Sequence, residues 1–107
     1  MDAGALHALI RDTCRRLGET LLKTEPTLTI FLFGSRAAGT ASPRSDVDLG
    51  IDAGHPLPSE LLSHVRDAFE GLPIFQKVDV VDFAEADPAF SRVAKEAVEI
   101  LYERKAA

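Results

Sequence analysis

Two carboxylates spaced two residues apart are the side chains of this chain best suited to chemistry. Asp46 and Asp48 lie in the segment Ser45-Asp46-Val47-Asp48-Leu49, which leads into an apolar stretch. In an extended strand, residues i and i+2 point to the same face, and their Cα atoms lie about 6.6 Å apart. Carboxylates on one face can converge on hard cations, because Mg²⁺ prefers oxygen ligands. The spacing therefore predicts a metal site, with loop capping as the alternative interpretation of Asp46.

A Gly-Ser pair precedes these carboxylates and follows the apolar run Ile30–Phe33. A Gly34-Ser35 turn that opens a helix offers backbone N–H groups and a hydroxyl to an anion. Cation ligands and an anion site together indicate a site for a metal-bound nucleoside triphosphate. Arg36 and Arg44 are candidates for neutralising further phosphate charge. Taken separately, Gly34 could be a plain turn glycine and both arginines could be surface residues.

The apolar periodicity of the chain predicts the elements that position these residues. Helical and extended segments alternate, which indicates an α/β (α+β) sandwich: a small mixed sheet of about three to four strands with helices packed against it. The expected elements are a helix from Leu6 to Leu21 that ends at Thr24-Glu25-Pro26, a strand from Leu28 to Phe33, a helical turn from Ser35 to Gly39, a loop from Thr40 to Ser45, a strand from Val47 to Ile51, a helix from Leu61 to Leu72 with Ser59 as candidate cap, a strand within Ile74–Phe83 that is strongest from Val78 to Val81, and a last helix from Phe90 to Leu101 after an N-cap and N1 pair at Asp87-Pro88.

Length and charge narrow the class of protein. The 107 residues predict a single domain spanning 1–107. No apolar run has the length of a membrane span, and no signal peptide is recognisable. One cysteine, Cys14, cannot form an internal disulfide, which favours a reducing cytoplasm, and its helical position predicts a core residue. The formal net charge of −5 disfavours direct nucleic-acid binding.

The motifs resemble the signature of a known family. Gly34-Ser35-Arg36-Ala37-Ala38-Gly39, followed by Ser45-Asp46-Val47-Asp48-Leu49, is similar to minimal nucleotidyltransferase (MNT) domains of the DNA polymerase β-like nucleotidyltransferase superfamily. The similarity extends to Lys77–Asp82 and Glu99–Glu103. It implies that the Gly34-Ser35 turn binds the triphosphate, that Asp46 and Asp48 bind Mg²⁺, and that a third carboxylate comes from a later strand. The chain departs from the family at Ala38, where many relatives carry a second arginine.

Two residues compete for the role of third carboxylate. Asp79 and Asp82 are three residues apart, so they point to opposite faces of a regular strand. Asp79 lies within an apolar run, where an unpaired carboxylate is costly. Asp82 lies at the end of the run, where solvent and capping explain it. Asp79 is therefore the expected ligand and general base, which completes the predicted catalytic and metal-binding set of Asp46, Asp48 and Asp79.

The resemblance also implies a reaction and a partner. The expected activity is Mg²⁺-dependent transfer of AMP from ATP to a hydroxyl, with pyrophosphate as leaving group. MNT proteins are often antitoxins that transfer AMP to a tyrosine of a HEPN RNase toxin, and this is the leading hypothesis. The alternatives are a binding module that neutralises its partner by contact alone and a nucleotidyltransferase for a small molecule. Apolar stripes on the first and last helices predict a homodimer or a tight complex with a partner.

Overall fold

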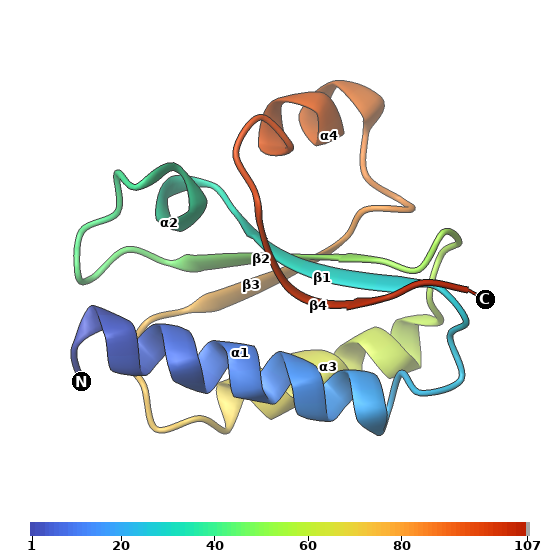
Figure 1. Ribbon diagram of the computed structural model, residues 1–107, viewed down its shortest axis with the longest axis horizontal. Coiled ribbons are helices and arrows are strands. Elements are labelled where there is room, and N and C mark those ends of the chain that lie inside the picture. Colours follow the sequence, from blue (N-terminus) through green and yellow to red (C-terminus); the bar gives the residue numbers. More distant parts are fainter. Residues whose placement is uncertain (107) are drawn as a thin grey trace.

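A mixed four-stranded sheet with the strand order β3-β2-β1-β4 organises the molecule (Figure 1). The computed structural model describes residues 1–106. Strand β1 pairs antiparallel with both β2 and β4, whereas β2 and β3 are parallel. The α/β fold with a small mixed sheet is thus confirmed. In chain order the elements are α1 (Ala3–Glu19), β1 (Leu28–Phe33), α2 (Ser35–Ala38), β2 (Val47–Asp52), α3 (Ser59–Glu70), β3 (Val78–Asp82), α4 (Pro88–Ala94) and β4 (Glu99–Arg104).

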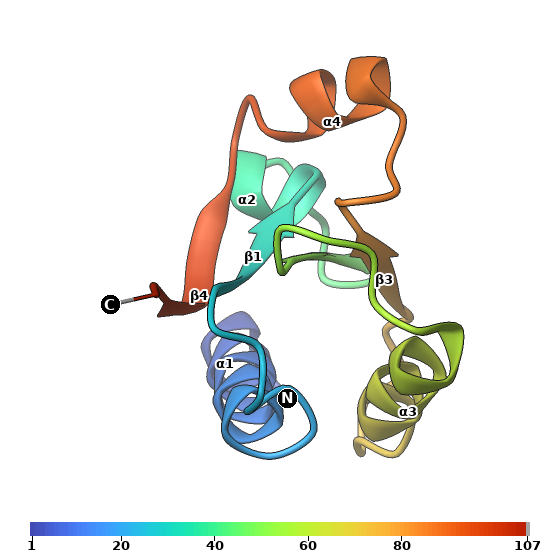
Figure 2. The same ribbon diagram turned by 90° about the vertical axis from the view of Figure 1, so that its right-hand side faces the viewer.

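The two faces of the sheet are covered differently. Helices α1 and α3 lie side by side under one face, and α4 stands over the other (Figures 1 and 2). Alternate strand residues fill the core between the sheet and α1 and α3, as the two-residue period of a strand requires. This main core includes Leu28, Ile30, Leu32, Val47, Leu49, Ile51, Val80 and Leu101. On the α4 side, Phe31, Phe33 and Phe83 form a second, smaller core.

Helix α1 buries a regular apolar stripe on the sheet. Asp2 caps its first turn by accepting a hydrogen bond from the backbone N–H of Ala5 at 2.7 Å. The helix begins earlier than the predicted Leu6 and ends at Glu19, so that Leu21 is exposed. Cys14 is fully buried, as predicted, and burial raises the pKa of its thiol to about 12.

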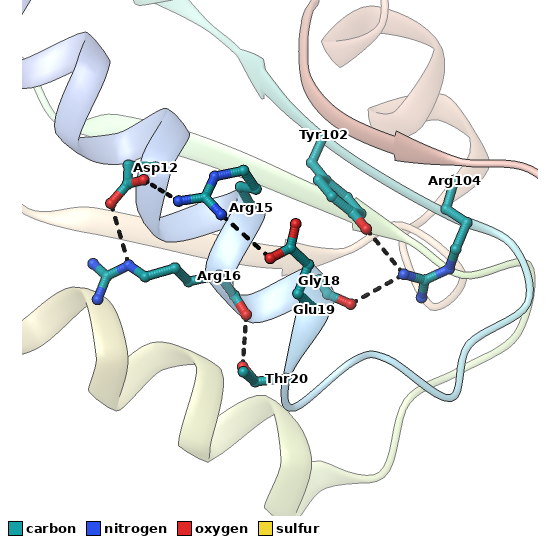
Figure 3. A network of polar contacts seen from close by, with 8 residues as sticks. All are labelled: Asp12, Arg15, Arg16, Gly18, Glu19, Thr20, Tyr102 and Arg104. Carbon is teal, nitrogen blue, oxygen red and sulfur yellow. Dashed lines mark hydrogen bonds and ion pairs between the residues drawn. The ribbon is translucent and has the colours of Figure 1, made fainter.

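Arg104 on β4 ties the end of α1 to the sheet (Figure 3). Its guanidinium donates hydrogen bonds to the backbone carbonyls of Gly18, Leu22 and Glu25 at 2.6 to 3.0 Å. A Cβ atom at Gly18 would overlap the ring of Tyr102, so glycine is needed for this close approach. The unpaired carbonyls at a helix end are thereby satisfied by a side chain.

Helix α3 begins without a side-chain cap. Pro58 occupies the N-cap position, and Ser59 is already the first helical residue, so the prediction of Ser59 as a cap was wrong. In contrast, Asp87 caps α4 by accepting hydrogen bonds from the N–H groups of Ala89 and Phe90. The predicted N-cap and N1 pair at Asp87-Pro88 is confirmed.

The predicted last helix from Phe90 to Leu101 was wrong in its second half. Helix α4 ends at Ala94, and the chain then enters β4, in which Ile100 pairs with Phe31. Leu101 enters the main core, next to a register shift between Ile30 and Phe31. Apolar residues spaced to suit a helix also suit a bulged strand, and pairing with the open edge of β1 decides between them. Within residues 1–106, no helix is long and apolar enough to cross a membrane.

Candidate active site

The centre of the candidate site is a pair of carboxylates on neighbouring parallel strands. Asp48 on β2 is in register with Asp79 on β3. Residues paired across two strands have Cα atoms about 5 Å apart and point to the same face. Asp48 is also in register with Phe33 on β1, so both carboxylates face the side of the sheet that α4 overhangs. Asp79, which the sequence analysis preferred to Asp82 as the third carboxylate, therefore lies beside Asp48.

The Gly34-Ser35 turn lies directly against this pair. Gly34 has a φ of 70° and a ψ of −152°, a conformation that side chains rarely adopt. A Cβ atom built on Gly34 would overlap the Oδ2 atom of Asp48. Glycine is therefore required at this position for two reasons, its backbone conformation and the closeness of the carboxylate. The Gly34-Ser35 turn and the Asp48 carboxylate, which are separated in the sequence, therefore lie against each other in the structure.

The ionised Asp48 carboxylate is unfavourable in the ligand-free structure. The pKa of its carboxyl is raised, first by burial and then by the negative charges of Asp79 and Asp46. No hydrogen bond offsets these effects for Asp48. Asp79 has one partner, Lys77, whose Nζ lies 3.2 Å from Oδ1. A divalent cation would relieve the repulsion among the carboxylates, because an opposite charge favours their ionised form.

Asp46 lies outside the pair, in the exposed end of the loop before β2. Its negative charge contributes to the raised pKa of Asp48, after burial and the charge of Asp79. Within residues 1–106, no three His, Cys, Asp or Glu side chains lie close enough together to form a ready metal site. The structure therefore brings together Asp48 and Asp79, and leaves Asp46 at the rim. Two carboxylates still fit Mg²⁺, which is commonly bound by one or two carboxylates together with substrate phosphates.

Two clefts lie on this side of the sheet, one along the carboxylates and one along the Gly34-Ser35 turn. The first, of about 590 Å³, contains Asp48 and Asp79 on its wall and is called the carboxylate cleft below. The second, of about 420 Å³, contains Gly34 and Ser35 and is called the turn cleft. Phe33 and Phe90 line both clefts, so α4 forms a shared wall.

The two arginines expected near phosphate have other partners. Arg36 donates hydrogen bonds to the backbone carbonyls of Pro43, Ser45 and Asp46. The Arg44 guanidinium lies 6.0 Å from the centre of the Phe75 ring, a cation–π contact on the surface. Their contact with a nucleotide stays a prediction.

Two further aspartates have structural roles. The Asp82 carboxylate accepts hydrogen bonds from the N–H groups of Leu57 at 2.9 Å and Ala84 at 3.0 Å. It therefore caps the backbone, as the alternative interpretation held, but it is buried rather than solvated, with 8% of the residue exposed. Asp52 ends β2, accepts a hydrogen bond from the Gly54 N–H and lies 3.7 Å from the Lys95 ammonium.

Sequence reasoning did not identify Lys77 and Phe90 as parts of the site. Lys77 is paired with Asp79, and Phe90 forms the wall between the clefts. Lys77 lies two residues before Asp79, so the two side chains share a face of the predicted strand. The sequence could therefore have indicated Lys77 as part of the site. Phe90 carried no such signal, because its position depends on the length and direction of α4.

The fold and the motif match a known class of enzyme. Residues 16–107 match the family model described as Polymerase beta, Nucleotidyltransferase. The chain therefore belongs to this family and is a nucleotidyltransferase. It is 29% identical over 80 residues to the Probable protein adenylyltransferase MntA of Haemophilus influenzae, a match that covers 75% of this chain and 70% of that protein.

Solved structures show the same fold. A chain of the toxin–antitoxin crystal structure MntA-HpeT is similar with a TM-score of 0.61 and 21% identity, over 86% of this chain and 72% of that chain. A toxin–antitoxin crystal structure with AMP-PNP gives 0.59 and 23%, over 86% and 72%. The complex of a tri-AMPylated Shewanella oneidensis HEPN toxin with its MNT antitoxin gives 0.57 and 20%, over 90% and 71%.

Proposed function

We propose that this nucleotidyltransferase transfers AMP from ATP to a hydroxyl of a partner protein, a tyrosine of a HEPN-type RNase toxin, and so acts as an antitoxin. The observation that carries the proposal is the Asp48–Asp79 pair beside the Gly34 turn. The similar proteins support the choice of acceptor, since one is described as a protein adenylyltransferase and another as an MNT antitoxin bound to an AMPylated HEPN toxin. A cytoplasmic location and a single domain spanning residues 1–107 belong to the same proposal.

In this mechanism the residues of the chain divide into two groups. Gly34 and Ser35 bind the triphosphate through backbone N–H groups and a hydroxyl. Asp48 and Asp79, together with Asp46 from the rim, would hold Mg²⁺, which when bound would neutralise negative charge on the reacting phosphate. Arg44 is exposed, so it is free to turn from its ring contact toward phosphate.

Asp79 accepts the proton of the acceptor hydroxyl. The hydroxyl oxygen then bonds to the α-phosphorus of ATP, and the bond from that phosphorus to the bridging oxygen breaks, so that pyrophosphate leaves. Positioning and charge neutralisation supply most of the catalysis in such a phosphoryl transfer. In the absence of nucleotide, the Asp79 carboxylate pairs with Lys77, which must shift when the site fills.

An acceptor protein has an apolar surface available next to the clefts. Exposed apolar side chains lie on α4, on the chain between α4 and β4, and at the start of β4: Phe90, Val93, Val98 and Ile100. Exposed apolar patches mark contact sites. We propose that the partner protein covers this surface, with a homodimer as the alternative occupant.

Transfer of labelled AMP to a co-expressed partner toxin tests the proposal. Asp48→Asn should abolish transfer, because the substitution removes one of the paired carboxylates. Asp52→Asn is a matched control, because Asp52 lies on the same strand and the same face but contacts Gly54 and Lys95 instead. Equal transfer by the wild type and Asp48→Asn would refute the proposed site.

The same experiment separates the alternatives. If Asp48→Asn transfers no AMP but still neutralises the toxin when co-expressed, the chain acts by contact alone. If label appears on a small molecule and not on the partner, the acceptor is a small hydroxyl compound. Either result would replace the proposed acceptor without changing the family.

A further inference from the structure

The guanidinium of Arg36 donates hydrogen bonds to the backbone of the loop that carries Asp46. Its Nη2 donates to the carbonyl of Ser45 at 2.6 Å and to that of Pro43 at 3.4 Å, and its Nε donates to the carbonyl of Asp46 at 3.3 Å. These carbonyls belong to the segment Pro43–Asp46, which precedes β2. One side chain thus holds three of the four residues in this segment.

Packing does little to hold the same loop. A cavity of about 310 Å³ lies between the loop and α1, and its walls include Leu6, Ile10, Ala41 and Pro43. A loop with empty space behind it gains few dispersion contacts on that side. Hydrogen bonds therefore contribute much of what fixes its conformation. Arg36 supplies three of them, Gln76 donates one more to the Pro43 carbonyl at 3.1 Å, and Ser42 and Ser45 bond to each other.

The position of the Asp46 carboxylate depends on this arrangement. On the C-terminal side of Asp46, the N–H of Val47 donates to the carbonyl of Lys77 at 2.8 Å and fixes the start of β2. On the N-terminal side, the backbone is held by Arg36. Arginine suits this role because its planar fork presents several donors at fixed angles, whereas lysine presents a single ammonium.

We propose that Arg36 is a positioning residue, which holds the backbone of Pro43–Asp46 so that the Asp46 carboxylate stays at the rim of the Asp48–Asp79 pair, and that it acts through this backbone rather than on the nucleotide. This inference rests on the proposed function of the carboxylates. It predicts that loss of Arg36 weakens metal binding and leaves binding of metal-free nucleotide unchanged.

The test compares Arg36→Met and Arg36→Lys with the wild type. Arg104→Met is the matched control, because Arg104 also binds backbone carbonyls with its guanidinium, but at the far end of α1 (Figure 3). Three measurements are needed: Mn²⁺ affinity by electron paramagnetic resonance with a non-hydrolysable ATP analogue present, affinity for the same analogue in EDTA by calorimetry, and AMP transfer as a function of Mg²⁺ concentration.

We expect Mn²⁺ affinity to fall about tenfold or more in Arg36→Met, the usual range for a residue that orients a metal ligand. The Mg²⁺ concentration for half-maximal transfer should rise by a similar factor, with the rate at saturating Mg²⁺ close to that of the wild type. Affinity for the analogue in EDTA should stay unchanged. Arg36→Lys should be intermediate, and it serves in the same assays if Arg36→Met does not fold. Arg104→Met should lower the melting temperature with no change in Mn²⁺ affinity.

Two results would overturn the inference. Unchanged Mn²⁺ affinity in Arg36→Met with a loss of affinity for the analogue in EDTA would make Arg36 a phosphate contact. An equal loss of Mn²⁺ affinity in Arg104→Met would mean that general destabilisation is responsible. Failure of the proposed function gives a different result, because the wild type itself would then neither bind Mn²⁺ with the analogue nor transfer AMP.

Discussion

Alanine substitutions at Asp82 and Asp79, both on β3, should have different effects. Asp82→Ala should lower stability, and Asp79→Ala should abolish AMP transfer. The Asp82 carboxylate accepts hydrogen bonds from the buried Leu57 N–H and from the Ala84 N–H. A hydrogen bond to a charged group contributes about 1.5–3 kcal/mol. Water can replace the bond at Ala84, which is exposed, but not the bond at Leu57. Asp82→Ala should therefore lower the free energy of unfolding by about 1.5–3 kcal/mol.

Asp79→Ala should have almost no effect on stability. Its carboxylate is 39% exposed, and its ion pair is with Lys77, whose side chain is 73% exposed. Surface ion pairs contribute about 0–1 kcal/mol. The substitution also removes a charge that repels Asp48. Transfer of AMP should nevertheless be lost, because Asp79 is the proposed base and ligand.

Thermal unfolding by circular dichroism and AMP transfer measure the two effects. For a domain of this size, 1 kcal/mol shifts the melting temperature by about 4–8 °C. Asp82→Ala should thus melt roughly 6–24 °C lower than the wild type. Transfer is measured below the lowest melting temperature, where Asp82→Ala should keep most of it. An Asp82→Ala protein that melts like the wild type but transfers no AMP would refute the assignment of Asp79.

Further substitutions check other parts of the structure. Gly34→Ala should destabilise the fold by about 1–3 kcal/mol through its positive φ, and abolish transfer; a wild-type melting temperature would contradict this. Ser35→Ala should weaken binding of a non-hydrolysable ATP analogue by at most about 1.5–3 kcal/mol, measured by calorimetry. The hydrogen bond to Glu25 raises the pKa of His55, so its stabilisation is complete below the unfolded-state pKa of about 6.5 and is lost as pH rises through the folded-state pKa. His55→Gln should therefore lower the melting temperature at about pH 5 but not at about pH 9. Because burial raises the pKa of Cys14 to about 12, a thiol reagent should label it only as fast as the chain unfolds.

The sequence was sufficient to predict the parts of the fold and site that depend on local patterns. The strand from Leu28 to Phe33 was predicted with its observed bounds, because a short apolar run rich in β-forming residues favours a buried strand. The two-residue alternation put Asp46 and Asp48 on one face and Asp79 and Asp82 on opposite faces, but the pairing of Asp48 with Asp79 follows from the register of β2 and β3. The choice of Asp79 over Asp82 rested on the cost of burying charge and on the family resemblance.

Predictions that depended on tertiary contacts failed or were incomplete. The residues after Ala94 suited a helix by spacing, yet β4 forms because β1 offers an open edge to Ile100. Asp82 was expected in solvent, but the segment that carries Leu57 folds over it. The partners of Arg36 are backbone carbonyls seven to ten residues away, which no local pattern reveals. In each case the deciding neighbour is fixed by the fold and not by nearby sequence.

The two faces of the sheet have different tasks, which explains how a small protein tolerates the repulsion among its site carboxylates. The face under α1 and α3 carries the main core and supplies most of the hydrophobic stabilisation. The opposite face carries Asp48, whose raised pKa means that the ionised carboxylate costs the ligand-free fold stability. This cost appears as pH rises from the unfolded-state pKa of an aspartate through the higher folded-state pKa. At neutral pH the cost is fully present, so Asp48→Asn should melt at or above the melting temperature of the wild type. A cation that binds the carboxylates should remove this difference by stabilising only the wild type. A stability gain that disappears when Mg²⁺ and a nucleotide analogue are added would therefore indicate a site built for binding rather than for folding.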